Sequence, residues 1–178
     1  MELLEKQISR IEIYSGHIVH LVKDTVILPN GKEAPREVCL HNGAVAIVPL
    51  LDDGRVIVER QFRYPHSRVF LEIPAGKLDT PNEDIVEAAQ RELREETGAV
   101  AKELIPLGKM IPSPAILSEV IYLFLARGLS FGERELDEDE FINLEFMPLS
   151  ELYQRCMNDE ISDAKTIVAV TRAVNYLK

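Results

Sequence analysis

Three carboxylates lie close together near the middle of the chain, at Glu92, Glu95 and Glu96. On a helix, at about 100° per residue, Glu92 and Glu96 project about 40° apart, and Glu95 lies about 60° to the other side of Glu92. Such a cluster repels itself unless a cation neutralises it, and hard divalent cations prefer oxygen ligands. The spacing therefore predicts a cation site. The alternative is a solvated helix face on which Arg91 pairs with Glu95.

The segment around these carboxylates has the pattern of an amphipathic helix. An apolar stripe recurs at three- and four-residue spacing and would anchor the helix to a core; it consists of Ile85, Val86, Ala89 and Leu93. Pro81 and Asn82 are typical of a helix start, and Gly98 is typical of the position just past a helix end. We therefore expect one face to be buried and the other to present carboxylates.

Composition limits the classes of protein that fit. The chain has 178 residues, 46% of them hydrophobic, and a net charge of −10, which suits one domain with a real core and argues against a general nucleic-acid binder. No stretch approaches the length of a membrane span, and the N-terminus lacks the apolar core of a signal peptide. Cys39 and Cys156 have no metal-ligand spacing, so we expect reduced thiols in a cytoplasmic protein without a membrane partner.

Strand patterns dominate the remainder of the chain. Residues 11–28 alternate in strand fashion, and after a strong turn signal at 29–32 the pattern resumes near 36–40, which predicts an N-terminal antiparallel hairpin. Residues 1–10 are a short helix or a frayed end. Further strands are predicted at 44–51, 55–62, 69–73, 104–111, 119–126 and 141–147.

The turn at 52–54 is expected to close a hairpin, and Ser150 and Ser162 are expected to cap two late helices. Strands with one central helix and two late ones predict an α+β domain with a mixed sheet between helices.

Residues 76–98 read GKLDTPNEDIVEAAQRELREETG, and they resemble the Nudix box, the signature of hydrolases that cleave nucleoside diphosphates linked to another moiety. The half that reads RELREETG matches up to Gly98. Six residues, rather than the five of the family pattern, separate Gly76 from Glu83, and Ala99 takes the aliphatic place. The extra residue falls in a turn, where it is easily absorbed.

The likeness extends beyond the box. Residues 43–45, 60–63, 72–76 and 113–114 resemble the branch that hydrolyses ADP-ribose and nucleotide sugars. This resemblance implies a Nudix-type α/β/α sandwich with a mixed sheet and an N-terminal antiparallel hairpin. It also implies a homodimer, with residues 1–40 as the dimerisation element and residues 41–178 as the hydrolase domain.

The resemblance assigns roles within and beyond the box. The metal ligands would be Glu92, Glu95, Glu96 and the backbone carbonyl of Ala75, holding Mg²⁺ or alternatively Mn²⁺. Gly76, Glu83 and Arg91 would support the box, the last two as an ion pair. The general base would lie on the acidic loop before residue 141, at Glu140 or, failing that, Glu138. The alternative for both is a solvated loop.

Charge points to the substrate contacts. Arg63 follows a strand end and is a candidate for a bidentate contact to a phosphate, the alternative being a surface arginine near a turn. Glu72 precedes the Gly76 loop and is a candidate to contact the substrate or a metal. Arg36, on the N-terminal hairpin, is a third candidate for a phosphate contact.

The resemblance implies a divalent-metal-dependent pyrophosphatase that hydrolyses ADP-ribose or a related nucleoside-diphosphate sugar to a nucleoside monophosphate and a sugar phosphate. Water would attack a phosphorus, and Glu140 would take its proton. The alternatives are another Nudix substrate (GDP-mannose, a dinucleoside polyphosphate or an RNA 5′ end) and a non-catalytic nucleotide-sugar sensor. The acidic composition argues against long RNA, and the intact Glu92, Glu95 and Glu96 argue against a sensor.

Overall fold

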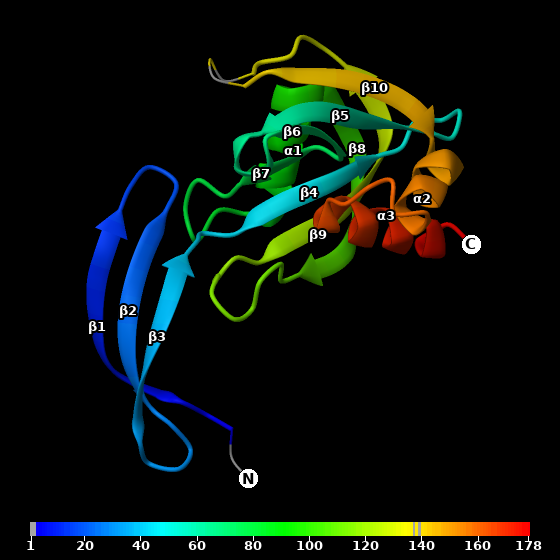
Figure 1. Cartoon of the computed structure of the whole chain (residues 1–178). Coiled ribbons are helices and arrows are strands. Elements are labelled where there is room, and N and C mark those ends of the chain that lie inside the picture. The colour runs from blue at the N-terminus through cyan, green and yellow to red at the C-terminus, as the bar shows by residue number, and fades with distance from the viewer. Residues whose placement is uncertain (1–2, 137, 139) are drawn as a thin grey trace. The chain divides into compact units, whose positions relative to one another are not determined.

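The structure is a computed structural model that describes residues 3–136, 138 and 140–178 (Figure 1). The chain forms two compact units, each described by itself below. The first contains Met1–Asn42 and Ile111–Glu119, and the second contains Gly43–Met110 and Val120–Lys178. The sequence did not predict that the loop 111–119 joins the N-terminal strands. None of the described helices is both long and apolar enough to cross a membrane.

The first unit is a three-stranded antiparallel sheet of β1 (Lys6–Ser15), β2 (His20–Ile27) and β3 (Glu33–Leu40), in that order. The predicted hairpin thus has one strand more than expected. The chain turns back where the Gly16 N–H donates to the Val19 carbonyl at 2.8 Å. The expectation of a helix or frayed end was wrong for residues 6–10, because they pair with β2.

Two sheets build the second unit. The first has the order β7-β4-β9-β8 and contains β4 (Ala44–Pro49), β7 (Ala75–Lys77), β8 (Ala99–Met110) and β9 (Ile121–Phe131). In this sheet β4 and β9 are parallel and the other pairs are antiparallel, so the sheet is mixed. The second is antiparallel, has the order β10-β5-β6, and contains β5 (Arg55–Arg63), β6 (Arg68–Glu72) and β10 (Ile142–Pro148).

The turn at 52–54 therefore does not close a hairpin within one sheet, as the sequence suggested. It carries the chain from β4 in the mixed sheet to β5 in the antiparallel sheet. Across it, the structure shows a bridge between Leu50 and Val56 and a hydrogen bond from the Leu51 N–H to the Arg55 carbonyl at 2.8 Å. A short 3₁₀ helix, Tyr64–His66, then connects β5 to β6.

The central helix α1 (Ile85–Thr97) begins later than Pro81 and Asn82 indicated, and its N-cap lies two residues after Asn82. Asp84 is the N-cap: its side chain accepts hydrogen bonds from the Val86 and Glu87 N–H groups, which satisfies donors that the first turn leaves unpaired. The C-cap is Gly98, as predicted, and its φ of 71° is the left-handed conformation that glycine adopts without strain.

The two late helices are α2 (Leu149–Met157) and α3 (Ala164–Tyr176). Neither predicted cap was right. No side-chain cap bond starts α2, which follows Pro148 directly. Asp163, rather than Ser162, caps α3 and accepts from the Thr166 N–H at 3.0 Å.

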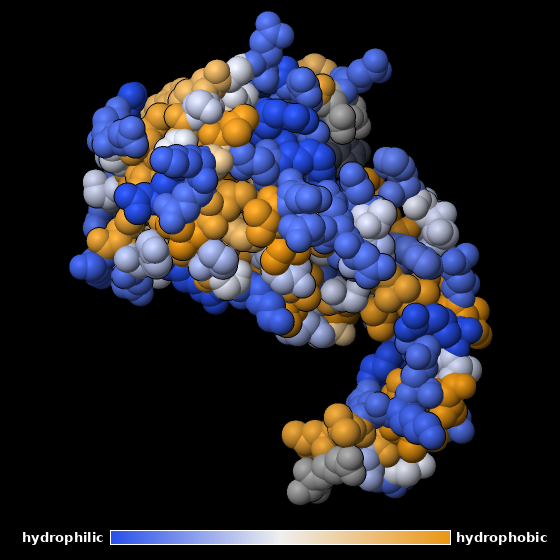
Figure 2. All heavy atoms as spheres, turned by 180° about the vertical axis from the view of Figure 1, so that it is seen from behind, coloured by the Kyte–Doolittle hydropathy of each residue, from blue (hydrophilic) through white to orange (hydrophobic). Residues whose placement is uncertain are grey.

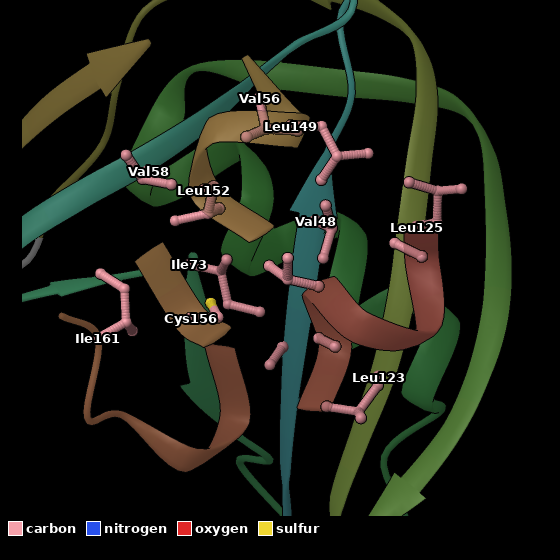
Figure 3. Close-up of a cluster of buried hydrophobic side chains, with 14 of the residues drawn as sticks. Val48, Val56, Val58, Ile73, Leu123, Leu125, Leu149, Leu152, Cys156 and Ile161 are labelled. Atoms are coloured by element: carbon pink, nitrogen blue, oxygen red, sulfur yellow. The ribbon is translucent and has the colours of Figure 1, made fainter. Parts of the chain in front are cut away.

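Alternate residues of β4 enter two different cores. Val48 packs with side chains of α2 and α3, including Leu152 (Figure 3), whereas Ile47 packs with Leu93 of α1. Period-two alternation on a strand buried on both faces produces this division. The sheet layer therefore lies between α1 on one face and α2 and α3 on the other, which confirms the predicted α/β/α sandwich.

Candidate active site

Helix α1 directs two carboxylates into the protein. Glu92 and Glu96 are only 9% and 3% exposed. The backbone N–H of Ala75, on β7, donates a hydrogen bond to Glu96 Oε2 at 2.9 Å. Strand β7, which precedes α1, therefore holds the carboxylate of Glu96, one of the predicted metal ligands, in place.

Gly76 makes room for the second carboxylate. A Cβ atom at this position would lie 1.9 Å from Glu92 Cδ and 2.1 Å from each of its carboxylate oxygens. Real contacts are never this short, so the carboxylate occupies the space that any other residue would fill. The requirement for glycine at the start of the box is thus steric.

Substituting Gly76→Ala should displace the Glu92 carboxylate and lower kcat about 30- to 100-fold, because catalytic groups misplaced by about 1 Å lose of the order of that factor. Steady-state kinetics would measure the loss. Gly132→Ala is the matched control, since a Cβ there meets only the Gly98 carbonyl oxygen at 4.0 Å and the backbone is not in the left-handed region. An active Gly76→Ala enzyme would contradict the steric role.

Arg91 lies among the acids of the box. Its guanidinium contacts Glu83 at 3.2 Å, Glu92 at 2.8 Å and Glu95 at 3.1 Å, and it donates to the Lys77 carbonyl at 3.2 Å. The predicted ion pair with Glu83 is therefore present. Arg91 also neutralises part of the charge on two of the predicted metal ligands, so it braces more of the site than the sequence suggested.

The carboxylates are close enough to affect one another. Burial raises the pKa of Glu92 to about 7, with repulsion from Glu95 and Glu140 adding to the rise. Burial also raises the pKa of Glu96 well above its ordinary value, and repulsion from Glu59, Glu92 and Glu140 contributes. Such a group of acids favours a cation between them.

Two candidates for the general base occupy different environments. Glu140 is half-buried and raises the pKa values of Glu92 and Glu96, whereas Glu138 is exposed. Asp137 and Asp139, which the sequence placed in the same acidic loop, lie outside the described residues. Electrostatic proximity to the buried acids therefore favours Glu140 over Glu138.

Arg134, which the sequence analysis missed, anchors the loop between β9 and β10 that carries Glu140. Its Nε donates to the Glu96 carbonyl at 2.6 Å, and its Nη2 donates to the Ile142 carbonyl at 3.2 Å. The Glu135 N–H also donates to the Glu95 carbonyl at 3.1 Å. The loop thus satisfies carbonyls at the end of α1 that the helix leaves unpaired, and this ties the segment carrying Glu140 to the helix carrying the acids.

Arg63 and Glu72, predicted as substrate contacts, bind each other. The Nε and Nη2 of Arg63 donate to the two Glu72 oxygens at 2.9 and 2.8 Å. Lys165, at the start of α3, forms a further ion pair with Glu72 and a 3.2 Å pair with Asp163. Burial pushes the pKa of Glu72 upward, but these cations outweigh it and lower the value. Lys165 gave no signal in the sequence.

Arg36 belongs to the first unit, where its Nε donates to Glu5 Oε2 at 2.8 Å. Its assignment to the substrate stays a prediction.

Glu59 on β5 is a buried acid that sequence reasoning missed. It is 0% exposed, and neither of its oxygens accepts a hydrogen bond from any residue that the structure describes. Burial raises the pKa of Glu59 to about 8. The available signal was its place directly after the apolar run of β5, which predicts a buried position.

The donor set fits a divalent cation. The buried acids offer only oxygen ligands, which suit Mg²⁺ and Mn²⁺. Within the described ranges, no three His, Cys, Asp or Glu side chains converge as a ready-made metal group, and Glu92 and Glu95 are instead turned toward Arg91. A cation would therefore compete with Arg91 for these two carboxylates.

A family model described as the NUDIX domain matches residues 40–169, well over half of the chain. The chain belongs to the Nudix family. Residues 76–98 are accordingly its Nudix box, and the resemblance drawn from them is confirmed. Nudix hydrolases generally use divalent metals, in agreement with the oxygen-rich donor set.

Several known Nudix relatives cover nearly the whole chain. It is 42% identical to the ADP-ribose pyrophosphatase of Bacillus subtilis, across 94% of this chain and 91% of that protein. It is 40% identical to the methanol dehydrogenase activator of Bacillus methanolicus, across 93% and 90%. A solved structure of an ADP compounds hydrolase superposes with a TM-score of 0.87 at 24% identity, across 99% and 96% of the two chains, which supports the fold.

Proposed function

We propose that this Nudix protein is a divalent-cation-dependent pyrophosphohydrolase that splits ADP-ribose, or a related nucleoside-diphosphate sugar, into a nucleoside monophosphate and a sugar phosphate. The observation that carries the proposal is the near-full-length similarity to the Bacillus subtilis ADP-ribose pyrophosphatase. A similar enzyme of Mycobacterium tuberculosis, 34% identical across 92% of the chain, supports the same substrate. The intact acids of the box make a silent sensor the weaker alternative.

The cation, which we propose to be Mg²⁺, would be held by Glu92, Glu95, Glu96 and the carbonyl of Ala75. When bound, it neutralises pyrophosphate oxygens and lowers the pKa of the attacking water. Glu140 accepts the proton of that water, since a carboxylate on a loop tethered to α1 can approach the buried acids. Arg91, which contacts Glu83 as well as Glu92 and Glu95, would hold the box together when the last two bind the cation.

Arg63 is proposed to bind a phosphate of the substrate. Its guanidinium is already oriented by two hydrogen bonds to Glu72, and arginine offers five donors, so it can keep one carboxylate and reach a second anion. Glu72 then acts as the group that holds Arg63 in place. Lys165 helps to keep Glu72 ionised.

A substrate panel tests the proposal. The panel contains ADP-ribose, GDP-mannose, UDP-glucose, diadenosine polyphosphates and NADH, each with Mg²⁺, with Mn²⁺ and with EDTA. We expect ADP-ribose with Mg²⁺ to give the highest kcat/KM and to yield AMP and ribose 5-phosphate. EDTA should abolish turnover. If another compound of the panel has a kcat/KM at least tenfold above that of ADP-ribose, that compound is the substrate. If no compound is hydrolysed, the non-catalytic nucleotide-sugar sensor is favoured.

A second candidate role is activation of a partner dehydrogenase, favoured by the similarity to the methanol dehydrogenase activator. Adding the protein to a methanol dehydrogenase assay, with and without Mg²⁺, distinguishes the two. Stimulation would support this role in addition to hydrolysis, and an unchanged rate would leave hydrolysis alone.

We further propose that the protein is a cytoplasmic homodimer that associates through the first unit. Every residue of β1 is exposed, including the large apolar Ile8, Ile11, Ile13 and Tyr14, and apolar side chains lie among charged ones on this surface (Figure 2). A long exposed edge strand of this kind favours association.

Sedimentation of the full chain should therefore give twice the mass of the monomer, and Ile11→Glu should shift the equilibrium toward monomer by tenfold or more. Lys102→Gln, which makes the same change in net charge at an exposed position on β8 of the second unit, is the control for altered net charge. A monomeric wild-type protein would refute the dimer.

A further inference from the structure

Glu59 is a buried acid for which the proposed reaction has so far given no use. Its side chain is fully buried, and both carboxylate oxygens lack a hydrogen-bond partner among the described residues. An ionised carboxylate in such a place is strongly destabilising unless something pairs with it. Either the acid is protonated, or its partner is not among the side chains that the structure describes.

The strand pattern shows where Glu59 points. Val56 and Val58 of β5 pack in the core that contains α2 and α3, whereas Ile57 packs in the core that contains Leu93 of α1. Because alternate residues share a face and β5 pairs with β10 without a register shift, Glu59 projects to the same side as Ile57. That side of the strand faces α1, the helix on which Glu96 is buried.

The charge interactions agree with this direction. After burial, Glu59 is the largest contributor to the raised pKa of Glu96, and Glu140 repels both acids. Glu59 is therefore a neighbour of the predicted cation ligands, approaching from a different strand.

Nearby cationic side chains have other partners. Glu59 lies directly opposite Glu72 in the β5–β6 register, and like charges in such a pair are destabilising. Arg63 and Lys165 compensate Glu72 with direct contacts. They lower the pKa of Glu59 only through space, without a hydrogen bond. Glu72 is therefore neutralised by direct ion pairs, and Glu59 is left for a different cation.

We propose that Glu59 is an additional ligand of the cation site, binding through its carboxylate a divalent cation that Glu96 also binds. This inference rests on the proposed cation-dependent function. It assigns to β5 a direct role in catalysis, in addition to α1, to β7 with Ala75 and to the loop that carries Glu140. It also explains why a buried carboxylate is kept at a position that an aliphatic residue could fill.

Mn²⁺ binding to the full-length protein tests the assignment without reliance on turnover. Electron paramagnetic resonance and calorimetric titrations would compare the wild type with Glu59→Gln. Loss of a ligand should weaken at least one Mn²⁺ site about tenfold or more, as disruption of metal-site contacts does. Glu145→Gln is the matched control: it removes one acid from the adjacent strand β10, where Glu145 pairs with Arg60, and should leave Mn²⁺ binding unchanged.

Thermal unfolding in EDTA checks that the variant folds. Gln is neutral and nearly isosteric, so metal-free Glu59→Gln should melt at or above the wild-type temperature, and Mn²⁺ should raise its melting temperature less than it raises that of the wild type. An equal number and affinity of Mn²⁺ sites in Glu59→Gln would overturn the assignment. If Glu96→Gln then loses Mn²⁺ while Glu59→Gln does not, only this inference fails. If neither loses it, the proposed cation site fails as well.

Discussion

Replacing Glu92 with Gln is expected to lower kcat about 10³-fold or more, equivalent to about 4 kcal/mol of transition-state stabilisation, while leaving the fold intact. The amide keeps the shape that fits against Gly76 but cannot neutralise a cation. Burial already raises the pKa of the native acid to about 7, so the metal-free protein near that pH tolerates a neutral group here. Steady-state kinetics over a Mg²⁺ titration would measure the loss, and circular dichroism would establish the fold.

The control for this substitution lies on the same helix. Glu87 occupies the first turn of α1 and is exposed, so Glu87→Gln removes the same charge without touching the buried acids and should retain activity within about twofold. Excess Mg²⁺ should restore part of the activity of Glu92→Gln if the defect is one of affinity. Wild-type turnover in Glu92→Gln at limiting Mg²⁺ would eliminate Glu92 as a ligand.

Local sequence patterns predicted the layers of the fold well, because buried strands and an amphipathic helix have strong periodicity. They predicted the helix starts poorly. Pro81 and Ser162 are acceptable near a helix start, but Asp84 and Asp163 are placed so that their carboxylates reach the free N–H groups of the first turn. Which of several neighbouring capping residues is used depends on where the chain leaves the preceding loop, and local sequence does not encode that.

The sequence analysis missed some residues of the site because their contacts join segments that are far apart in the chain. Glu59 is separated by more than thirty residues from Glu92 and Glu96, and the stacking of β5 against α1 brings them together. Lys165 meets Glu72 across 93 positions, and Arg134 meets the Glu96 carbonyl across 38. Glu92, Glu95 and Glu96 could be predicted from the sequence because a single helix, α1, contains all three. The three missed residues belong to β5, α3 and the loop between β9 and β10, and their roles follow from tertiary packing alone.

Glu140→Gln is expected to slow turnover about 10²- to 10³-fold, the usual contribution of a positioned general base, with KM changed by no more than about threefold. We expect this effect because of where Glu140 lies. Glu140 is half-buried and its charge repels three buried acids, Glu59, Glu92 and Glu96. A group that only bound the substrate would raise KM instead, so the separation of kcat from KM tests the role directly.

The matched variant is Glu138→Gln, which removes an exposed acid from the same loop and should leave kcat within about twofold of the wild-type value. The pH profile adds a second test. Wild-type kcat should fall toward acid as the base is protonated, and Glu140→Gln should lose that limb, because a glutamine does not titrate. If Glu138→Gln alone is inactive and alone loses the acid limb, the base is Glu138. In that case the coupling of Glu140 to the buried acids serves the cation rather than the water, and the loop tethered by Arg134 would position a ligand instead of a base.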